Sequence, residues 1–235
     1  GCCMTYHFEN IPSLIMSILQ AFPVTCEILV VSLVISLGIG CIVAIGSLSE
    51  NKTLNKIAFT WIAFMRGVPT LVMMFLLFLG LPQLMNNIGI PISTTNKLPY
   101  IIATLSLTSS SNMAEMMRAS YLAVDKGQSE AAYSIGMDGF TTLRRIVFPQ
   151  AFGIAIPMLG NNIVNLFKET SLAFTIGVVD ILGKARAISA ASFGANKLET
   201  YISAGIIFWA ICLILEGTFN VLEKVYTKGR KKATS

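Results

Sequence analysis

The composition of this chain of 235 residues excludes an ordinary soluble domain, because 54% of the residues are hydrophobic and only 12% are charged. Residues 28–49 and 67–96 contain no charge at all, and a helix of roughly 17–25 mostly apolar residues crosses a bilayer. The net charge of +5 does not indicate nucleic-acid binding, because its distribution follows membrane topology. The predicted fold is all-α, a polytopic membrane protein with five transmembrane helices.

The residues before the first span contain two features. Cys2 and Cys3 are either the site of a lipid anchor or the remnant of a leader in front of a start at Met4. Residues 11–22 are apolar on one helical face, so we expect this segment to lie along the outer membrane interface. The five cysteines and the single histidine, His7, have no spacing typical of a metal site.

Basic residues determine the predicted orientation of the spans. The five spans are predicted at about 24–46, 57–81, 98–121, 150–175 and 200–222. Lys and Arg are concentrated in the first loop, the third loop and the C-terminal tail, and they are fewer on the opposite side. The positive-inside rule therefore places the N-terminus outside the cell and the C-terminus in the cytoplasm.

Polar side chains occur inside the second and third spans, where they are costly unless they face a helix bundle or a watery cavity. Arg66 either extends towards the lipid headgroups or contacts a substrate or gate. Glu115 can pair with Arg118, three residues further on, either as a structural ion pair or as part of a pathway. The small polar run Thr108–Asn112 favours contact with another helix or with water.

The loop after the third span, residues 122–149, is too polar to cross a membrane and too apolar to be a plain linker. Residues 128–135 are predicted to form one short helix, which Gly136 ends because glycine adopts left-handed dihedrals at little cost. Asp138 is predicted to cap a second helix that runs to about Val147. Two short helices at the cytoplasmic face form a projection that suits a partner protein.

The fourth span, which Pro149 is predicted to begin, carries a polar stripe. Asn161, Asn165 and Lys168 recur at helical spacing, and Glu169 follows. A stripe of this kind facing lipid is costly, so we expect it to line a translocation path or a subunit seam. Alternatively, Lys168 and Glu169 mark the end of the helix at the outer surface.

Six residues of the loop match the spacing of the signature loop of ABC-importer permeases: Glu130, Ala131, Ala132, Gly136, Ile146 and Pro149. Phe148 stands where Leu is commoner in that family. Three further elements resemble its polar amino acid subfamily, namely residues 66–70, 114–118 and 168–172. Asn112 occupies a place usually held by Tyr, so we expect the pocket lining to differ there.

The resemblance implies a single ABC transmembrane permease domain over residues 1–235, located in a bacterial cell membrane. In this family the loop docks on a cytoplasmic ABC ATPase dimer that binds Mg-ATP, so no cofactor of the chain's own and no enzymatic activity are expected. The sequence agrees in containing no phosphate-binding loop. A second permease subunit, identical or different, completes the path, and an extracytoplasmic amino-acid-binding protein delivers the substrate.

The resemblance also implies a substrate pathway in which both signs of charge replace the water around an amino acid zwitterion. Its expected residues are Arg66, Asn112, Glu115, Asn161, Asn165, Lys168, Glu169 and Ser171. The residues around 125–128 and 171–186 look most like the cystine branch, which predicts L-cystine, with glutamine, glutamate or another polar amino acid as alternatives. A different class, an ion-coupled secondary transporter, would also suit the charged span residues but has no need of the signature loop.

Overall fold

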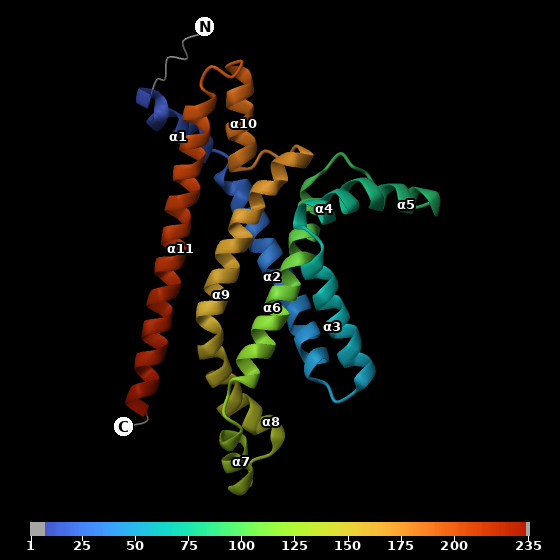
Figure 1. The fold of residues 1–235 in the computed structure, drawn as a ribbon, viewed down its shortest axis with the longest axis vertical. Helices are drawn as coiled ribbons and strands as arrows, with labels where there is room; N and C mark the ends of the chain where they lie inside the picture. Colours follow the sequence, from blue (N-terminus) through green and yellow to red (C-terminus); the bar gives the residue numbers. More distant parts are fainter. Residues whose placement is uncertain (1–7, 234–235) are drawn as a thin grey trace. The chain divides into compact units, whose positions relative to one another are not determined.

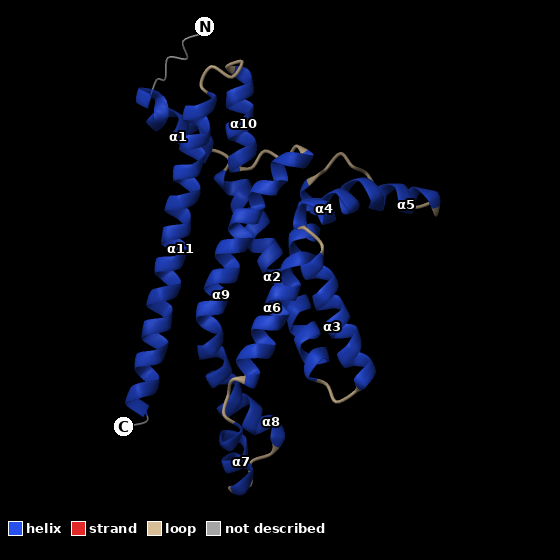
Figure 2. Cartoon of the chain, viewed as in Figure 1, coloured by secondary structure: helices blue, strands red, loops and turns tan. Residues whose placement is uncertain are grey.

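The computed structural model describes residues 8–233, which contain helices and loops and no strand (Figure 2). The predicted all-α fold is therefore confirmed over this range. Cys2, Cys3 and His7 lie outside the described residues, so the predictions of a lipid anchor or leader remain predictions.

The chain divides into two compact units. The first unit comprises the residues up to 34 together with 68–106 and 165–214, and the second comprises 35–67, 107–164 and the residues from 215 onward. Four of the five divisions fall inside long helices, which are α2 (Phe22–Leu48), α6 (Leu98–Leu122), α9 (Phe148–Thr170) and α11 (Lys197–Ala233) (Figure 1). The fifth falls after residue 67. Each unit is thus built from helix segments that lie far apart in the sequence.

Four helical stretches of the described residues are long and apolar enough to cross a membrane. They are Phe22–Leu48, Thr70–Asn87, Gly139–Ile176 and Lys197–Tyr226. α6 has the length of a span, with 25 residues, but its serines, threonines and charged side chains make it less apolar. The structure is therefore that of a multi-pass helical membrane protein, and α6 corresponds to the predicted span 98–121.

The second predicted span, residues 57–81, is not one continuous helix. α3 (Lys52–Gly67) ends before Val68, and α4 (Thr70–Phe75) begins after Pro69. Proline has no N–H to donate and disfavours α-helical dihedrals in the residue before it, so the helix breaks at this point. Arg66 consequently lies at a helix end rather than in the middle of a span.

Residues 8–233 contain two π-helical turns, and each ends just before an X–Pro pair. Leu76–Gly80 joins α4 to α5 (Leu81–Asn87), and Leu143–Val147 joins α8 (Gly139–Thr142) to α9. The wider turn shifts the carbonyl that the proline ring would otherwise meet. α8 thus continues into α9, whereas the sequence predicted a separate second helix and a span beginning at Pro149.

In the first unit, two apolar clusters hold the helices together. The larger cluster joins α2, α4, α6 and the end of α9, and its fully buried members include Ile28, Met74, Ile101, Leu105 and Leu166. The smaller cluster packs α1 (Ile11–Leu19) against α10 (Ile181–Ala191) and α11. Burial of side chains of this size contributes roughly 1.5–3 kcal/mol each, so these clusters fix the positions of the polar residues between them.

In the second unit, glycines allow helices to approach closely. A Cβ added at Gly40 of α2 would lie 2.7 Å from the Cβ of Met113 on α6, and one added at Gly153 of α9 would lie 2.5 Å from the Tyr226 ring on α11. Small residues at helix crossings are typical of membrane bundles, where close packing replaces the hydrophobic effect. Larger side chains at these two positions would force the helices apart.

Candidate functional site

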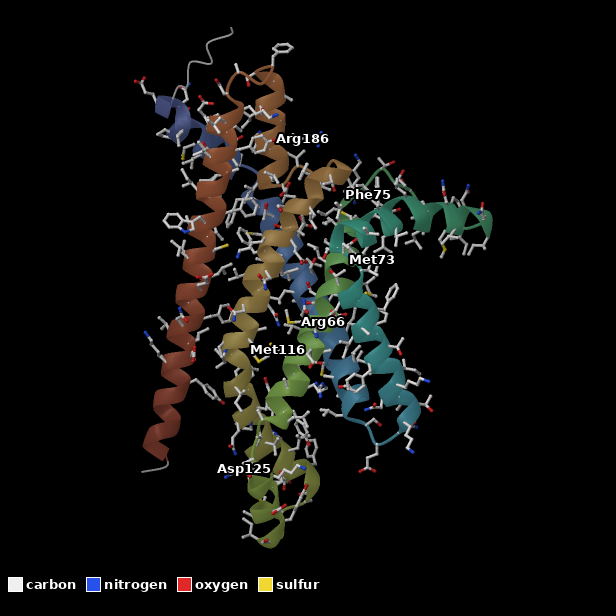
Figure 3. All side chains as sticks on the ribbon, in the orientation of Figure 1. Arg66, Met73, Phe75, Met116, Asp125 and Arg186 are labelled. Carbon is white, nitrogen blue, oxygen red and sulfur yellow. The ribbon has the colours of Figure 1, made fainter. Side chains whose placement is uncertain are left out.

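The segment between α6 and α9 in the second unit folds as α7 (Lys126–Ser134) followed by α8 (Figure 1). The Asp125 carboxylate accepts a hydrogen bond at 2.8 Å from the N–H two residues ahead and so caps α7 (Figure 3). Asp138 accepts hydrogen bonds at 3.1 and 3.2 Å from the N–H groups two and three residues ahead and caps α8. The predicted cap at Asp138 is confirmed, and α7 begins two residues before its predicted start because Asp125 caps it.

Gly136 ends α7 in the left-handed conformation, with φ +82°. Its N–H donates to the Tyr133 carbonyl at 3.0 Å, and the Met137 N–H donates to the Ala132 carbonyl at 3.1 Å, which is how many helix C-termini close. A Cβ at Gly136 would meet nothing within 4 Å. The need for glycine here is therefore conformational, and the predicted end of the first helix is confirmed.

The six signature residues of the loop differ in burial. The exposed ones are Glu130, Ala131, Gly136 and Pro149, whereas Ala132 is buried and Ile146 is half-buried. Within α7, α8 and the turn between them, three large apolar side chains are exposed, those of Tyr133 (54%), Ile135 (77%) and Phe140 (70%). The sequence analysis did not select these three, although single apolar residues in an otherwise polar loop were the available signal.

In the second unit, two guanidinium groups lie near one carboxylate. Glu115 and Arg118 form an ion pair at 2.7 Å, as their spacing predicts, and Arg118 also lies 5.5 Å from the centre of the Phe59 ring of α3. Arg66, at the end of α3, interacts electrostatically with Glu115 and has an exposed side chain (Figure 3). This group can hold an anionic or a zwitterionic ligand.

Three asparagines of α6 and α9 in the second unit differ in their surroundings. Asn112 on α6 and Asn161 on α9 have exposed side chains. Asn162, which the pathway prediction did not include, donates instead to the thioethers of Met116 at 3.7 Å and Met113 at 3.9 Å. Asn162 thus joins α9 to α6, whereas the side chains of Asn112 and Asn161 are exposed.

The remaining predicted pathway residues lie in the first unit, near the end of α9. Asn165 and Lys168 are exposed, and Glu169 is half-buried with the Thr70 hydroxyl of α4 bonded to its carboxylate. The Ser171 hydroxyl donates to the Lys168 carbonyl at 2.7 Å, so it serves the local backbone. Thr70 was not predicted as a site residue. Its position directly after the helix break at Pro69 was an indication of a special role in the sequence.

A second capped corner follows in the first unit and was also missed. Gly177 has φ +84° and lies close to Lys97, whose Nζ would be 2.8 Å from an added Cβ. Asp180 caps α10 by accepting from the N–H groups two and three residues ahead, at 3.3 and 2.8 Å, and the Ile181 N–H donates to the Thr25 hydroxyl at 3.2 Å. Asp180 is 0% exposed, and burial raises its pKa to about 6 although the backbone N–H groups act in the opposite direction.

The described residues offer charged and amide groups rather than a metal site. Between residues 8 and 233, no three His, Cys, Asp or Glu side chains lie together as metal ligands would. No disulfide joins the described cysteines Cys26, Cys41 and Cys212, which lie inside long helices.

Comparison with known proteins agrees with this picture. Residues 36–228 match the family described as "Binding-protein-dependent transport system inner membrane component". The chain is 39% identical over 210 residues to the L-cystine transport system permease protein TcyL of Bacillus subtilis (strain 168), covering 89% of this chain and 87% of that protein. It is also 35% identical over 228 residues to the probable amino-acid permease protein YxeN of the same organism, covering 97% of each.

The fold is similar to a solved structure as well. The crystal structure of an amino acid ABC transporter with histidines superposes with a TM-score of 0.82 at 26% identity, covering 94% of this chain and 99% of that chain. The multi-pass helical arrangement, the signature loop and these likenesses agree. The chain belongs to the family of inner membrane components of binding-protein-dependent transport systems.

Proposed function

We propose that this chain is the permease subunit of an ATP-driven ABC importer of a polar amino acid, and that L-cystine is the substrate. Family membership and the likeness to an amino acid ABC transporter support the class of function. The 39% identity to an L-cystine transport permease supports the substrate. The observation that carries the proposal is the doubly capped loop of α7 and α8, closed at Gly136.

This loop suits contact with a cytoplasmic ATPase. Glu130, Ala131 and Gly136 are exposed on it, and the apolar side chains of Tyr133 and Phe140 stand beside them. Apolar side chains exposed on a polar loop are typical of protein interfaces, whose centres are rich in aromatic residues. Ala132, which is buried, and Ile146, which is half-buried, would support the contact surface from beneath.

The loop is also built to transmit a displacement. Aspartate caps fix the start of both short helices, and the Gly136 turn sets the angle between them. α8 continues through a π-helical turn into α9, which carries Asn161 in the same unit. Movement of α8 by a closing ATPase would therefore be carried along a continuous helix to a polar position in the membrane.

The pathway that we propose contains polar residues of both units. In the second unit they are Arg66, Asn112, Glu115 and Asn161, and in the first unit they are Asn165, Lys168, Glu169 and Ser171. An amino acid carboxylate would bind the exposed ammonium of Lys168, and its amino group would bind the adjacent carboxylate of Glu169. Ser171, whose hydroxyl bonds the Lys168 carbonyl, would orient the lysine rather than contact the substrate.

The proposal includes partners and an orientation. A second permease subunit would complete the path, an extracytoplasmic amino-acid-binding protein would deliver the substrate, and a dimer of ABC ATPases would bind Mg-ATP, so the permease needs no cofactor. The distribution of Lys and Arg supports an N-terminus outside the bacterial inner membrane and a cytoplasmic C-terminus.

The substitution Gly136→Asp tests the coupling loop. Aspartate adds a charge, and its Cβ makes the left-handed backbone conformation unfavourable by roughly 1–2 kcal/mol. The substitution should therefore change the direction in which α8 leaves the turn. We expect normal membrane levels, loss of the ATPase subunits on purification, and uptake reduced to background. Gly139→Ala is the matched control, because a Cβ there meets nothing within 4 Å and its φ is not in the left-handed range.

Uptake measurements with L-cystine, glutamine and glutamate complete the test. If Gly136→Asp retains its ATPase subunits and transports normally, the loop does not couple ATP hydrolysis to transport. If the cognate binding protein and the intact permease import glutamine but not L-cystine, the substrate assignment is wrong while the permease assignment stands.

A further inference from the structure

A groove of about 600 Å³ runs along one face of α3 in the second unit. Lys52 and Lys56 line its beginning, Ile57, Trp61 and Phe64 line the rest, and two threonines lie between them. The opposite face of α3, with Ala58, Ile62 and Met65, is buried. The groove therefore faces away from the core of its unit, and it is basic at one end and apolar along most of its length.

Among the residues that the structure describes, none forms an ion pair with the basic end of the groove. Lys52 and Lys56 are four residues apart and so lie on the same face of the helix. Both are exposed, and in the part of the chain that the structure describes neither ammonium forms an ion pair. Glu50, in the preceding turn, is not among the lining residues. An anionic group is the ligand that this end would attract.

The apolar part of the groove has the length of a lipid chain in one leaflet. From Lys56 to Phe64 the helix rises about 12 Å, and one leaflet provides about 15 Å of hydrocarbon. Ile57 is 60% exposed and Phe64 is 54% exposed. The Trp61 indole is fixed by its N–H, which donates to the Ser110 hydroxyl of α6 at 3.1 Å.

We propose that this groove binds an acidic phospholipid, with the phosphate between Lys52 and Lys56 and an acyl chain along Ile57, Trp61 and Phe64. The predicted orientation places the two lysines at the cytoplasmic surface, where anionic lipids attract basic residues. Charge complementarity favours this occupant, because two exposed ammonium groups lie at one end of the groove and its lining contains no carboxylate to neutralise them. This site does not rest on the proposed transport function.

Tryptophan fluorescence tests the proposal directly. The chain has two tryptophans, Trp61 and Trp209, so Trp209→Phe leaves Trp61 as the only reporter. The full-length Trp209→Phe protein is reconstituted into phosphatidylcholine vesicles that contain brominated phosphatidylglycerol, and separately into vesicles in which an equal share of phosphatidylcholine is brominated. We expect phosphatidylglycerol to quench Trp61 more strongly than its mole fraction predicts.

Charge variants then assign the preference to the lysines. Lys52→Gln with Lys56→Gln should lower the relative association constant of phosphatidylglycerol over phosphatidylcholine by roughly two- to five-fold per lysine. Lys52→Arg with Lys56→Arg should retain the preference. Lys224→Gln on α11 removes a charge outside the groove and should leave the preference unchanged. Equal quenching by brominated phosphatidylcholine in all variants checks that each protein has inserted.

Three outcomes would overturn the site. If both brominated lipids quench Trp61 equally, or if the glutamine variants keep the preference, the lysines do not select an acidic headgroup. If neither lipid quenches Trp61, another protein surface covers the groove, and the lipid proposal is wrong.

Discussion

The corner at Gly136 in the second unit and the corner at Gly177 in the first unit follow the same backbone plan. In each, a helix ends in a glycine with φ near +80°, at +82° and +84°. In each, the glycine N–H and the next N–H donate to carbonyls of the last helical turn. An aspartate two or three residues later, Asp138 or Asp180, then caps the following helix.

The two corners differ in what surrounds them. Asp138 is exposed, and a hydrogen bond from the Thr141 hydroxyl lowers its pKa. Asp180 is buried, and its desolvation raises its pKa to about 6. Three residues after the exposed Asp138 stands Thr141, whereas three residues after the buried Asp180 stands Gly183. A Cβ added to Gly183 would lie 2.5 Å from the Val178 carbonyl oxygen. Short-range sequence determines the backbone plan, and burial determines the consequence of changing it.

The two corners should differ most in how much stability is lost when the capping aspartate is replaced by alanine. Asp180→Ala leaves two partly buried backbone N–H groups without their acceptor, which should lower the free energy of unfolding by about 2–3 kcal/mol. Asp180→Asn keeps an acceptor oxygen and should cost less. Asp138→Ala should have a small effect, because water can reach the N–H groups of α8. Thermal unfolding in mild detergent measures all three, and equal losses for the two alanine variants would contradict the comparison.

A smaller effect should appear in the pH dependence of stability. The folded-state pKa of Asp180 is raised above the ordinary value of 3.8 to about 6, so between these values the folded state holds a proton that the unfolded state lacks. Stability from this group is thus fully present below about pH 4 and is lost as the pH rises through 6. Between pH 5 and 7 the loss should be on the order of 1 kcal/mol.

Matched variants isolate this pH effect. Asp180→Asn cannot titrate, so its stability should change less between pH 5 and 7 than that of the wild type. The pKa of Asp138 is lowered, so its contribution is lost only at more acidic pH and Asp138→Asn should keep the wild-type slope in this range. The same slope in wild type and Asp180→Asn would show that another group titrates.

The two corners also show how much the sequence could predict. Gly136 and Asp138 were predicted because the surrounding loop is polar and matches a signature spacing. Gly177 and Asp180 have the same residue types, but they follow an apolar span directly. Their surroundings, which bury Asp180, depend on contacts with α2 and with the loop before α6, and both of these lie far away in the sequence. The order of the helices was similarly predictable from charge and hydropathy.

The details that could not be predicted depend on geometry. Pro69 was visible, but whether it bends or breaks the helix depends on the packing of α3 and α4. At Pro149 the helix was predicted to begin anew, but α8 continues into α9. A single widened π-helical turn accommodates the proline ring, so the helix is not interrupted there. Thr70 joined the candidate site only because the packing of the first unit brings α4 to Glu169.

The two corners should differ least in how much stability is lost when the glycine is replaced by alanine. Gly136→Ala and Gly177→Ala both force a Cβ into a left-handed position, at a cost of about 1 kcal/mol each. Only the Cβ at Gly177 meets another group, the Lys97 ammonium at 2.8 Å. That group is the end of a flexible side chain and can move aside, but it then leaves the C-terminal end of a helix, where a positive charge contributes about 0.5 kcal/mol. Gly177→Ala should therefore cost about 0.5 kcal/mol more than Gly136→Ala. In a Lys97→Ala background this excess should vanish, and an excess that persists there would mean that Gly177 is required for a reason other than the position of Lys97.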